Sequence, residues 1–584
     1  MKAKNQMYRA TTLVLFVLLT LWRAQTGFAQ TPDPGAPGPL AVTTEEYNFG
    51  DTAFTPTNFP GPVELIGAVH YPTSLSGPLP LIILLHGRHA TCFQGDGAQF
   101  LEWPCAMGRQ SIPSYKGYDY LADVLASHGY IVVSIGANGI NAKDNQVRDL
   151  GALARAELIQ KHLDLWNAFS TVGGAPFGTK FVGKVDLTRV GTMGHSRGGE
   201  GVVRHYVLNQ AQGAPYGVKA VFPLAPVDFN RFVVNNAALT VLLPYCDGDV
   251  SDLQGVHFYD DARYNVPGDP APKHYVLVMG ANHDFYNTIW SPSSPYPGGT
   301  DDWLAFVSGG SSDSQCGVVN GNHRLTEAQQ RGTGLAYMSA FFRAYVGGET
   351  QFLPLLTGDA PAPPSATTND LFVSYHAPDN SDLRLDVNRL LTNTNLTTNT
   401  VGGAVTPFGL SPYDLCGGPA PQPQKCLPDE PNARQPHTTP SARSNARGLS
   451  QLRTGWSDLT ASYGNGLPGP TRNVSGFQAV QFRVSVNFAD LRNIAGALQE
   501  FSVLLTDSSG RTASVRVNDY SRALYFPPGN VGPVPKVVLN TVRIPLSAFA
   551  QVNLNSIRSV QFKFDQNLAG ALLITDVAFA SAPQ

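Results

Sequence analysis

Residues 189–209 read RVGTMGHSRGGEGVVRHYVLN and contain the motif Gly-x-Ser-x-Gly at Gly194, Ser196 and Gly198. An apolar run at 190–193 precedes the motif, and a helical pattern at 198–209 follows it. A strand that turns sharply into a helix is the setting in which this motif presents a nucleophilic serine. The pentapeptide alone is a weak signal. Its setting predicts that Ser196 is a nucleophile at the end of a strand.

Short aliphatic runs alternate with helical patterns from residue 63 to residue 346. Continuous aliphatic runs are typical of strands covered on both faces in a parallel sheet. We expect strands at 81–85, 130–135, 190–193, 218–224, 239–243 and 275–279, and helices at 117–128, 150–165, 198–209 and 325–346. The alternation predicts an α/β catalytic domain at 63–346, with three layers and a mostly parallel sheet.

The pattern changes beyond residue 346. Residues 347–369 end in TGDAPAPPSATTN and are expected to be a linker. Apolar and polar residues then alternate, most clearly at 480–488, which predicts a half-buried strand, and a hairpin is expected through Asp507 to Gly510. Residues 370–584 are therefore predicted to form an all-β sandwich with a Pro-rich insertion at 417–444.

The N-terminus has the features of an export signal. Lys2, Lys4 and Arg9 precede an apolar run at 13–22, and small residues lead to a cleavage point after Ala29. That run is too short to span about 30 Å of hydrocarbon. We expect a signal peptide at 1–29, a lead-in at 30–62, and a secreted or periplasmic protein without a membrane span.

The cysteines and the net charge agree with an exported protein that does not bind nucleic acid. Six cysteines allow fifteen disulfide arrangements, of which pairing between neighbours is the simplest: Cys92 with Cys105, Cys246 with Cys316, and Cys416 with Cys426. Their spacing lacks the close pairs of a zinc site. A formal charge of −3 offers no broad attraction for nucleic acid or anionic lipid.

A serine hydroxyl needs a base that removes its proton. His283 lies in GANHD, directly after the last expected strand at 275–279, which is where such a base belongs. His195 is expected to shape the turn at the serine. The other histidines weighed lack a position at a strand end: His257, His274 and His323.

The acid should follow the preceding strand at 239–243, where residues 245–250 read YCDGDV. We favour Asp249, because a turn of about this length usually separates strand and acid; Asp247 is the alternative and Asp228 a third candidate. The acid fixes the histidine tautomer and stabilises the imidazolium. A calcium loop that also uses Asp252 is the competing interpretation, but the glycine and the distal glutamate of an EF-hand are missing.

An oxyanion hole needs two N–H groups aimed at the developing charge. Arg197, directly after the serine, is expected to supply one from its backbone. Arg88, in the loop HGRH at 86–89, is expected to supply the other, with His89 as the alternative donor. The loop between Cys92 and Cys105 begins here and is expected to form one wall of the substrate cleft.

Residues 63–346 resemble the α/β-hydrolase superfamily, and within it the secreted cutinase-like polyesterases, dienelactone hydrolases and platelet-activating-factor acetylhydrolases. The features that carry this resemblance are the strand running into His86, the segment ASHGY at 126–130, the serine turn and the loops of Asp249 and His283. The resemblance implies hydrolysis of small or polymeric carboxylic esters through an acyl-serine, without metal or organic cofactor. Arg197 departs from it, since the polyesterases carry an apolar Met there. Glu200 follows about one helical turn later. The charged side chains of Arg197 and Glu200 argue against assuming a polyester substrate.

The C-terminal half resembles galactose-binding-like or carbohydrate-binding sandwiches, mainly over residues 541–579. Trp456, Tyr463 or Tyr520 would then stack on sugars, or else belong to the core. An esterase for polysaccharide side groups, held on its substrate by the sandwich, is therefore the alternative function. A non-catalytic adhesive protein is a third hypothesis, and the same triad also serves amidases and peptidases.

Overall fold

The structure is a computed structural model that describes residues 32–319, 323–368, 370–418, 425–427, 434–438 and 448–583. The expected signal peptide at 1–29 and most of the expected insertion at 417–444 lie outside these residues. Within the described ranges, no helix is long and apolar enough to cross a membrane.

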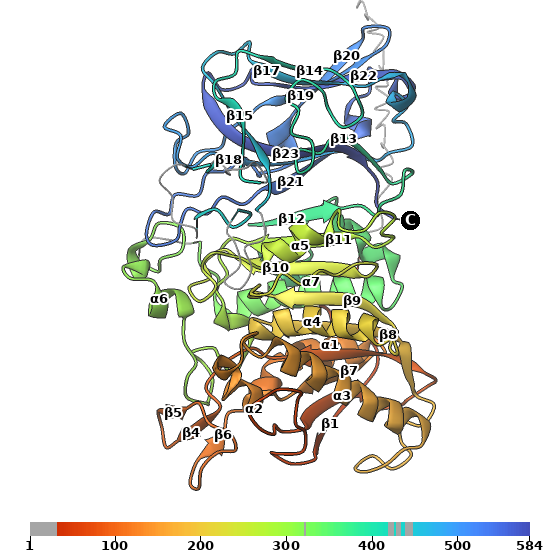
Figure 1. Ribbon diagram of the computed structural model, residues 1–584, viewed down its shortest axis with the longest axis vertical. Coiled ribbons are helices and arrows are strands. Elements are labelled where there is room, and N and C mark those ends of the chain that lie inside the picture. Colours follow the sequence, from red (N-terminus) through yellow and green to blue (C-terminus); the bar gives the residue numbers. More distant parts are fainter. Residues whose placement is uncertain are drawn as a thin grey trace, which may run out of the picture.

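A nine-stranded mixed sheet forms the centre of the N-terminal part (Figure 1). In spatial order its strands are β1 (Val42–Asn48), β2 (Ile66–Pro72), β7 (Ile131–Ile135), β3 (Leu79–Leu85), β8 (Val185–His195), β9 (Val218–Leu224), β10 (Ala238–Pro244), β11 (Lys273–Val278) and β12 (Leu371–His376). The strands from β7 to β11 run parallel to their neighbours, whereas β1, β2 and β12 pair antiparallel at the two edges. The expected α/β class with a mostly parallel sheet is therefore confirmed.

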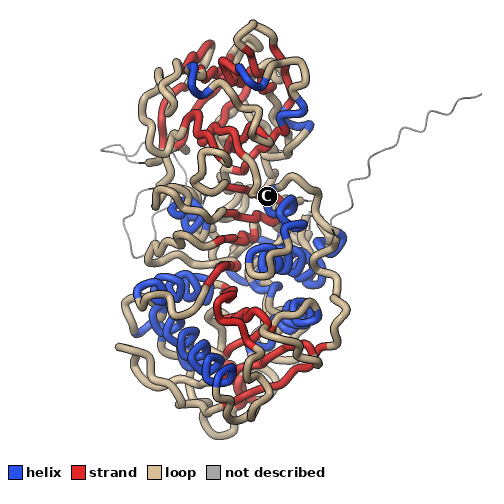
Figure 2. Tube along the Cα trace, turned by 90° about the vertical axis from the view of Figure 1, so that its right-hand side faces the viewer, coloured by secondary structure: helices blue, strands red, loops and turns tan. Residues whose placement is uncertain are grey.

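Helices cover both faces of this sheet (Figure 2). The residues that α3 (Ala152–Thr171) and α4 (Arg197–Ala211) bury belong to the core of one face, which includes Leu158, Trp166 and Val202. Those of α1 (Asp119–Ser127) and α7 (Glu327–Tyr345) belong to the core of the other face, which includes Leu121 and Phe341. Shorter helices lie in the connections: α2 (Asn138–Asn141), α5 (Val256–Ala262), α6 (Asp302–Phe306) and α8 (Leu353–Thr357).

The expected linker at 347–369 and the domain boundary after it need correction. Helix α8 lies within these residues, and Leu355, Leu356 and Ala366 are buried in the core of the N-terminal part. The next segment, β12, pairs with β11 and forms an edge of the nine-stranded sheet. Proline-rich composition predicts an irregular path, but irregular chain can still pack. The free edge of β11 is what recruits the strand beyond it.

The C-terminal part is built from two antiparallel sheets around a shared apolar core. The six-stranded sheet contains β13 (Arg384–Asn388), β15 (Tyr413–Cys416), β16 (Gln451–Trp456), β18 (Ala479–Val486), β21 (Asn540–Pro545) and β23 (Gly570–Ala580). The five-stranded sheet contains β14 (Val405–Phe408), β17 (Ser462–Gly466), β19 (Ser502–Asp507), β20 (Thr512–Arg516) and β22 (Ile557–Lys563). β19 and β20 form the expected hairpin.

The strand expected to be half-buried at 480–488 is β18, and all of its residues are buried. Its polar face is covered by the N-terminal part, because Gln481 donates to the carbonyl of Tyr375 at 2.9 Å and Arg483 contacts Asp260 at 3.0 Å. An alternating pattern shows which face is polar. It does not show whether water or another domain covers that face.

The three disulfides are those expected from pairing neighbours. Cys92–Cys105 lies at a small sheet of β4 (Cys92–Gln94), β5 (Ala98–Phe100) and β6 (Gln110–Ser111), which is separate from the nine-stranded sheet.

Candidate active site

The motif at 194–198 forms a sharp turn between β8 and α4. Ser196 has φ 57° and ψ −123°, a conformation that non-glycine residues rarely adopt outside functional sites. A Cβ atom on Gly194 would lie 2.0 Å from the carbonyl oxygen of Gly198, and one on Gly198 would lie 2.7 Å from that of His86. The turn therefore requires both glycines, and it keeps the serine at the carboxyl end of the central strand.

The loop at 86–89 lies directly against this turn. A Cβ on Gly87 would be 2.5 Å from Ser196 Cβ, so only glycine allows the approach. The Gly87 carbonyl accepts a hydrogen bond from Asn141 at 2.9 Å, which anchors the loop. Arg197 is the first residue of α4, where backbone N–H groups have no partner within the helix. The two expected oxyanion donors, Arg88 and Arg197, thus lie on segments that meet at Ser196.

His283 is held in one orientation by two aspartates. Its Nδ1 lies 2.8 Å from Asp247 Oδ2, and its backbone N–H donates to Asp302 Oδ1 at 2.9 Å. Because a carboxylate only accepts, Nδ1 carries the proton and Nε2 keeps a free lone pair. Nε2 is buried and has no hydrogen-bond partner in the described part of the chain. That atom is therefore available to receive a proton from a nucleophile.

The two candidate acids occupy different environments. Asp247 is buried, its Oδ2 contacts His283, and its Oδ1 accepts the N–H of Val250 at 2.6 Å. Asp249 has a half-exposed side chain (53%), and its Oδ2 lies 3.7 Å from Nε2 of His283. The favoured acid, Asp249, thus does not make the contact with Nδ1, and the alternative, Asp247, does. Residue counting could not separate them, because the local turn decides which carboxylate faces inward.

The remaining candidates lie elsewhere or have other partners. Asp228, the third candidate acid, contacts His257 at 3.2 Å. His274 bonds the carbonyl of Leu356 at 2.7 Å. Neither arrangement involves the serine turn.

The electrostatics of the site stabilise the imidazolium that forms when His283 accepts a proton. Burial lowers the pKa of His283, but the adjacent Asp247 carboxylate outweighs it and raises that pKa well above its usual value. Burial, reinforced by the charge of Asp247, raises the pKa of Asp302 to about 6. Asp302 also accepts the N–H of Gly248 at 2.7 Å. It therefore binds both the loop at 245–250, here called the acid loop, and the loop at 280–284 that carries His283.

His195 connects the serine turn to the histidine. Its Nε2–H donates to the carbonyl of His283 at 3.1 Å, its Nδ1 accepts from the Tyr118 hydroxyl at 3.0 Å, and its ring lies 4.7 Å from that of Trp290. Burial lowers its pKa well below the usual value. His195 is therefore a neutral support for the turn, as expected, and it brings His283 next to the residue that precedes Ser196.

The charged side chains beside the serine are engaged within the protein. Asp144 is fully buried and contacts three guanidinium groups, those of Arg88 at 3.1 Å, Arg155 at 2.8 Å and Arg197 at 2.9 Å. Glu200 is also buried and accepts the backbone N–H of Asn230 at 2.8 Å. The sequence did not indicate Asp144, because it lies more than forty residues away from any part of the motif in the chain.

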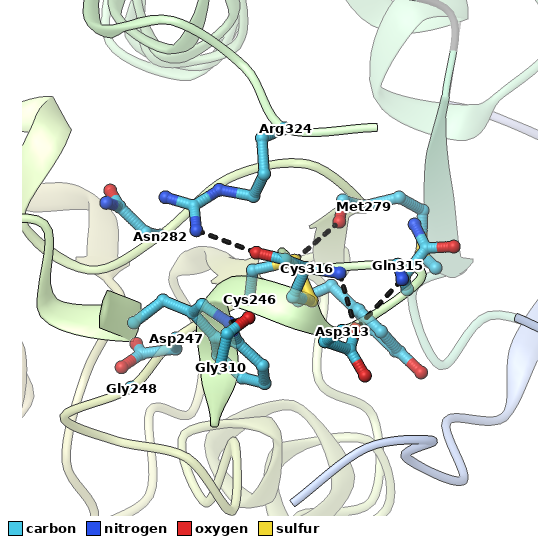
Figure 3. The surroundings of a disulfide bond; sticks show 12 residues. Cys246, Asp247, Gly248, Met279, Asn282, Gly310, Asp313, Gln315, Cys316 and Arg324 are labelled. Atoms are coloured by element: carbon cyan, nitrogen blue, oxygen red, sulfur yellow. Dashed lines mark hydrogen bonds between the residues drawn. A yellow bond between two sulfur atoms is a disulfide. The ribbon is translucent and has the colours of Figure 1, made fainter. Parts of the chain in front are cut away.

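The Cys246–Cys316 disulfide ties the acid loop to a segment beyond the histidine (Figure 3). Asp313 accepts the N–H of Cys316 at 2.6 Å, and Arg324 donates to the Cys316 carbonyl at 3.0 Å. The residue after Cys246 is Asp247, so the bridge anchors the acid directly. Among the described residues, no group of three or more His, Cys, Asp or Glu side chains is arranged to hold a metal ion.

The chain is similar to known ester hydrolases in this region. A family described as PET hydrolase-like matches residues 111–292, which include Ser196, Asp247 and His283. "Cutinase est2" of Thermobifida alba is 28% identical over 178 residues, which is 29% of this chain and 50% of the relative. "Cutinase 1" of Thermobifida cellulosilytica is 28% identical over 176 residues, 29% of this chain and 58% of the relative. The chain thus spans about half the length of the curated relatives that it matches.

Proposed function

We propose that this protein is a secreted carboxylic-ester hydrolase of the α/β-hydrolase type that acts through Ser196, His283 and Asp247. The observation that carries the proposal is the buried contact between His283 and Asp247, which leaves Nε2 free beside the serine turn. The similarity to cutinases and to the PET hydrolase-like family supports ester hydrolysis. The three disulfides support an extracellular or periplasmic location.

The proposed reaction has two steps, acylation and deacylation. In each step His283 accepts one proton and then donates one. Ser196 Oγ attacks the ester carbonyl while His283 Nε2 takes its proton, and Asp247 stabilises the imidazolium. The oxyanion accepts hydrogen bonds from the N–H groups of Arg197 and Arg88. The intermediate collapses, the imidazolium protonates the departing alkoxide, and an acyl-Ser196 remains. Water, deprotonated by His283 Nε2, then attacks the acyl carbonyl. The second intermediate collapses with cleavage of the bond to Ser196 Oγ, the imidazolium returns its proton to Oγ, and the acid leaves.

The substrates that we propose are small or polymeric carboxylic esters. The charge of Arg197 argued against a polyester, but Arg197 is paired with Asp144 and Asn145 and is not an isolated cation in the cleft. The carbohydrate-esterase alternative has no support in the comparisons. Two of the three aromatics that suggested it, Trp456 and Tyr463, are buried in the core of the C-terminal part, and only Tyr520 is exposed.

Covalent labelling by a fluorophosphonate probe tests the nucleophile. The wild-type protein should be labelled and should hydrolyse p-nitrophenyl esters, whereas Ser196→Ala should do neither. Ser170→Ala is the matched control, since that hydroxyl bonds the Asn167 carbonyl at the end of α3. Labelling of Ser196→Ala at the wild-type rate would contradict the proposal.

A further inference from the structure

A segment of the C-terminal part reaches the acid loop of the catalytic part. Val534 and Val538 are buried within the apolar core of the catalytic sheet, although they precede β21 of the C-terminal sheet. Between them lies Lys536, whose side chain is almost fully buried (1%). Two domains that merely shared a linker would not interleave their cores in this way.

Lys536 contacts the acid loop with both its side chain and its backbone. The ammonium donates to the carbonyl of Tyr245 at 2.7 Å and lies 3.5 Å from the carbonyl of Asp247. The backbone N–H of Lys536 donates to the Tyr245 hydroxyl at 3.0 Å. One residue of the C-terminal part therefore holds the backbone on both sides of Cys246.

A buried ammonium is costly, and an apolar side chain could fill the same interface. Burial lowers the pKa of Lys536 to about 8, against the opposing effect of four carboxylates, those of Asp247, Asp252, Asp302 and Asp313. Two of these carboxylates, those of Asp247 and Asp302, also form hydrogen bonds with His283.

A second contact from the same segment converges on this loop. Asp313 Oδ2 accepts the N–H groups of Asn530 at 2.9 Å and Val531 at 3.0 Å. Its other oxygen accepts the N–H of Cys316, the disulfide partner of Cys246 (Figure 3). The C-terminal segment is thereby linked to the residue before Asp247 from the opposite side.

We propose that Lys536 is a positioning residue of the active site, which fixes the backbone carbonyls of Tyr245 and Asp247 and so holds the Asp247 carboxylate against His283. This inference rests on the proposed triad. It makes the C-terminal part a component of the catalytic unit, in place of an appended binding module.

The test compares two buried lysines. Lys536→Met removes the donor and the charge; Lys273→Met is the matched control. Lys273 is equally buried and donates to the Ala237 carbonyl at 2.8 Å, but it begins β11 at the end remote from His283. Lys536→Met should lower kcat on the order of ten- to a hundredfold with KM within about threefold, and Lys273→Met should leave kcat within about threefold at temperatures well below its Tm.

The pH dependence separates positioning from stability. Removal of a nearby positive charge raises the pKa of His283, so the acidic limb of kcat/KM should move to higher pH in Lys536→Met. Lys536→Arg, which keeps donor and charge, should restore the wild-type limb. If Lys536→Met does not fold, Lys536→Gln keeps a donor without charge and should show the same shift of the limb.

An unshifted limb in the folded neutral variant, or equal losses of kcat in the Lys536 and Lys273 variants, would overturn the inference. Failure of the proposed function is a different result, since Ser196→Ala and Asp247→Asn would then retain full activity. If both of these are inactive while Lys536→Met behaves as Lys273→Met, only the positioning role is lost.

Discussion

Asp247→Asn and Asp249→Asn remove a charge at positions two residues apart, but only the first alters the hydrogen bond of His283. In Asp247→Asn, Oδ1 still accepts from Val250, so the amide nitrogen faces Nδ1 at about the position of Oδ2. An amide N–H cannot accept from Nδ1–H, and the histidine is driven to the tautomer protonated on Nε2. That tautomer cannot take the proton of Ser196.

The expected loss follows from this geometry. A wrong tautomer in a Ser-His-Asp triad lowers kcat by about 10⁴, which is roughly 5 kcal/mol of lost transition-state stabilisation. Asp249 is 3.7 Å from Nε2, but its side chain is half exposed and screened by water. Its substitution should change kcat/KM by less than about tenfold. The two variants should thus differ by about three orders of magnitude.

The assay is p-nitrophenyl ester hydrolysis, measured as kcat/KM across pH, with thermal unfolding as a check of folding. Loss of either negative charge lowers the pKa of His283, so the acidic limb should move to lower pH in both variants, further in Asp247→Asn. The reasoning is refuted if folded Asp249→Asn loses a thousandfold while Asp247→Asn stays within tenfold of the wild type.

Three further perturbations test the surroundings of the site. Asp144→Asn leaves three arginines around a neutral amide and should destabilise the fold by about 3–5 kcal/mol, measured by urea unfolding; an unchanged midpoint contradicts this. Gly87→Ala places a Cβ 2.5 Å from Ser196 Cβ and should lower kcat on the order of a hundredfold. Its Tm should fall less than that of Asp144→Asn. A wild-type kcat would contradict this, because it would show that the loop at 86–89 can shift away from Ser196. Replacing Cys246 and Cys316 together by Ala opens a loop of sequence separation 70 and should cost about 2–5 kcal/mol, and equal stability of the oxidised wild type and the variant would count against it.

Much of the catalytic half was predictable because the signals are local. The serine turn, the strand before it and the helix after it occupy one continuous stretch, and hydrophobic periodicity places β9, β10 and β11 within one or two residues of their bounds. The position of His283 follows from the end of β11. The pairing of cysteines by proximity also matches the structure.

The features that involve two distant segments were not predictable. Whether β12 belongs to the catalytic sheet depends on the free edge of β11. Whether the polar face of β18 meets water depends on where the C-terminal part docks.

The sequence by itself predicted the serine turn, the order of the candidate acid and base along the chain, and the α/β class, because each depends on neighbouring residues and on the period of a single element. Only the tertiary structure decided that Asp247 and not Asp249 faces His283, that Arg197 shares the buried Asp144, and that Lys536 reaches the acid loop. The physical reason is the same in each case. A side chain's partner is set by the folding of a turn or the docking of a domain, and neither produces a repeating pattern of apolar and polar residues in the sequence.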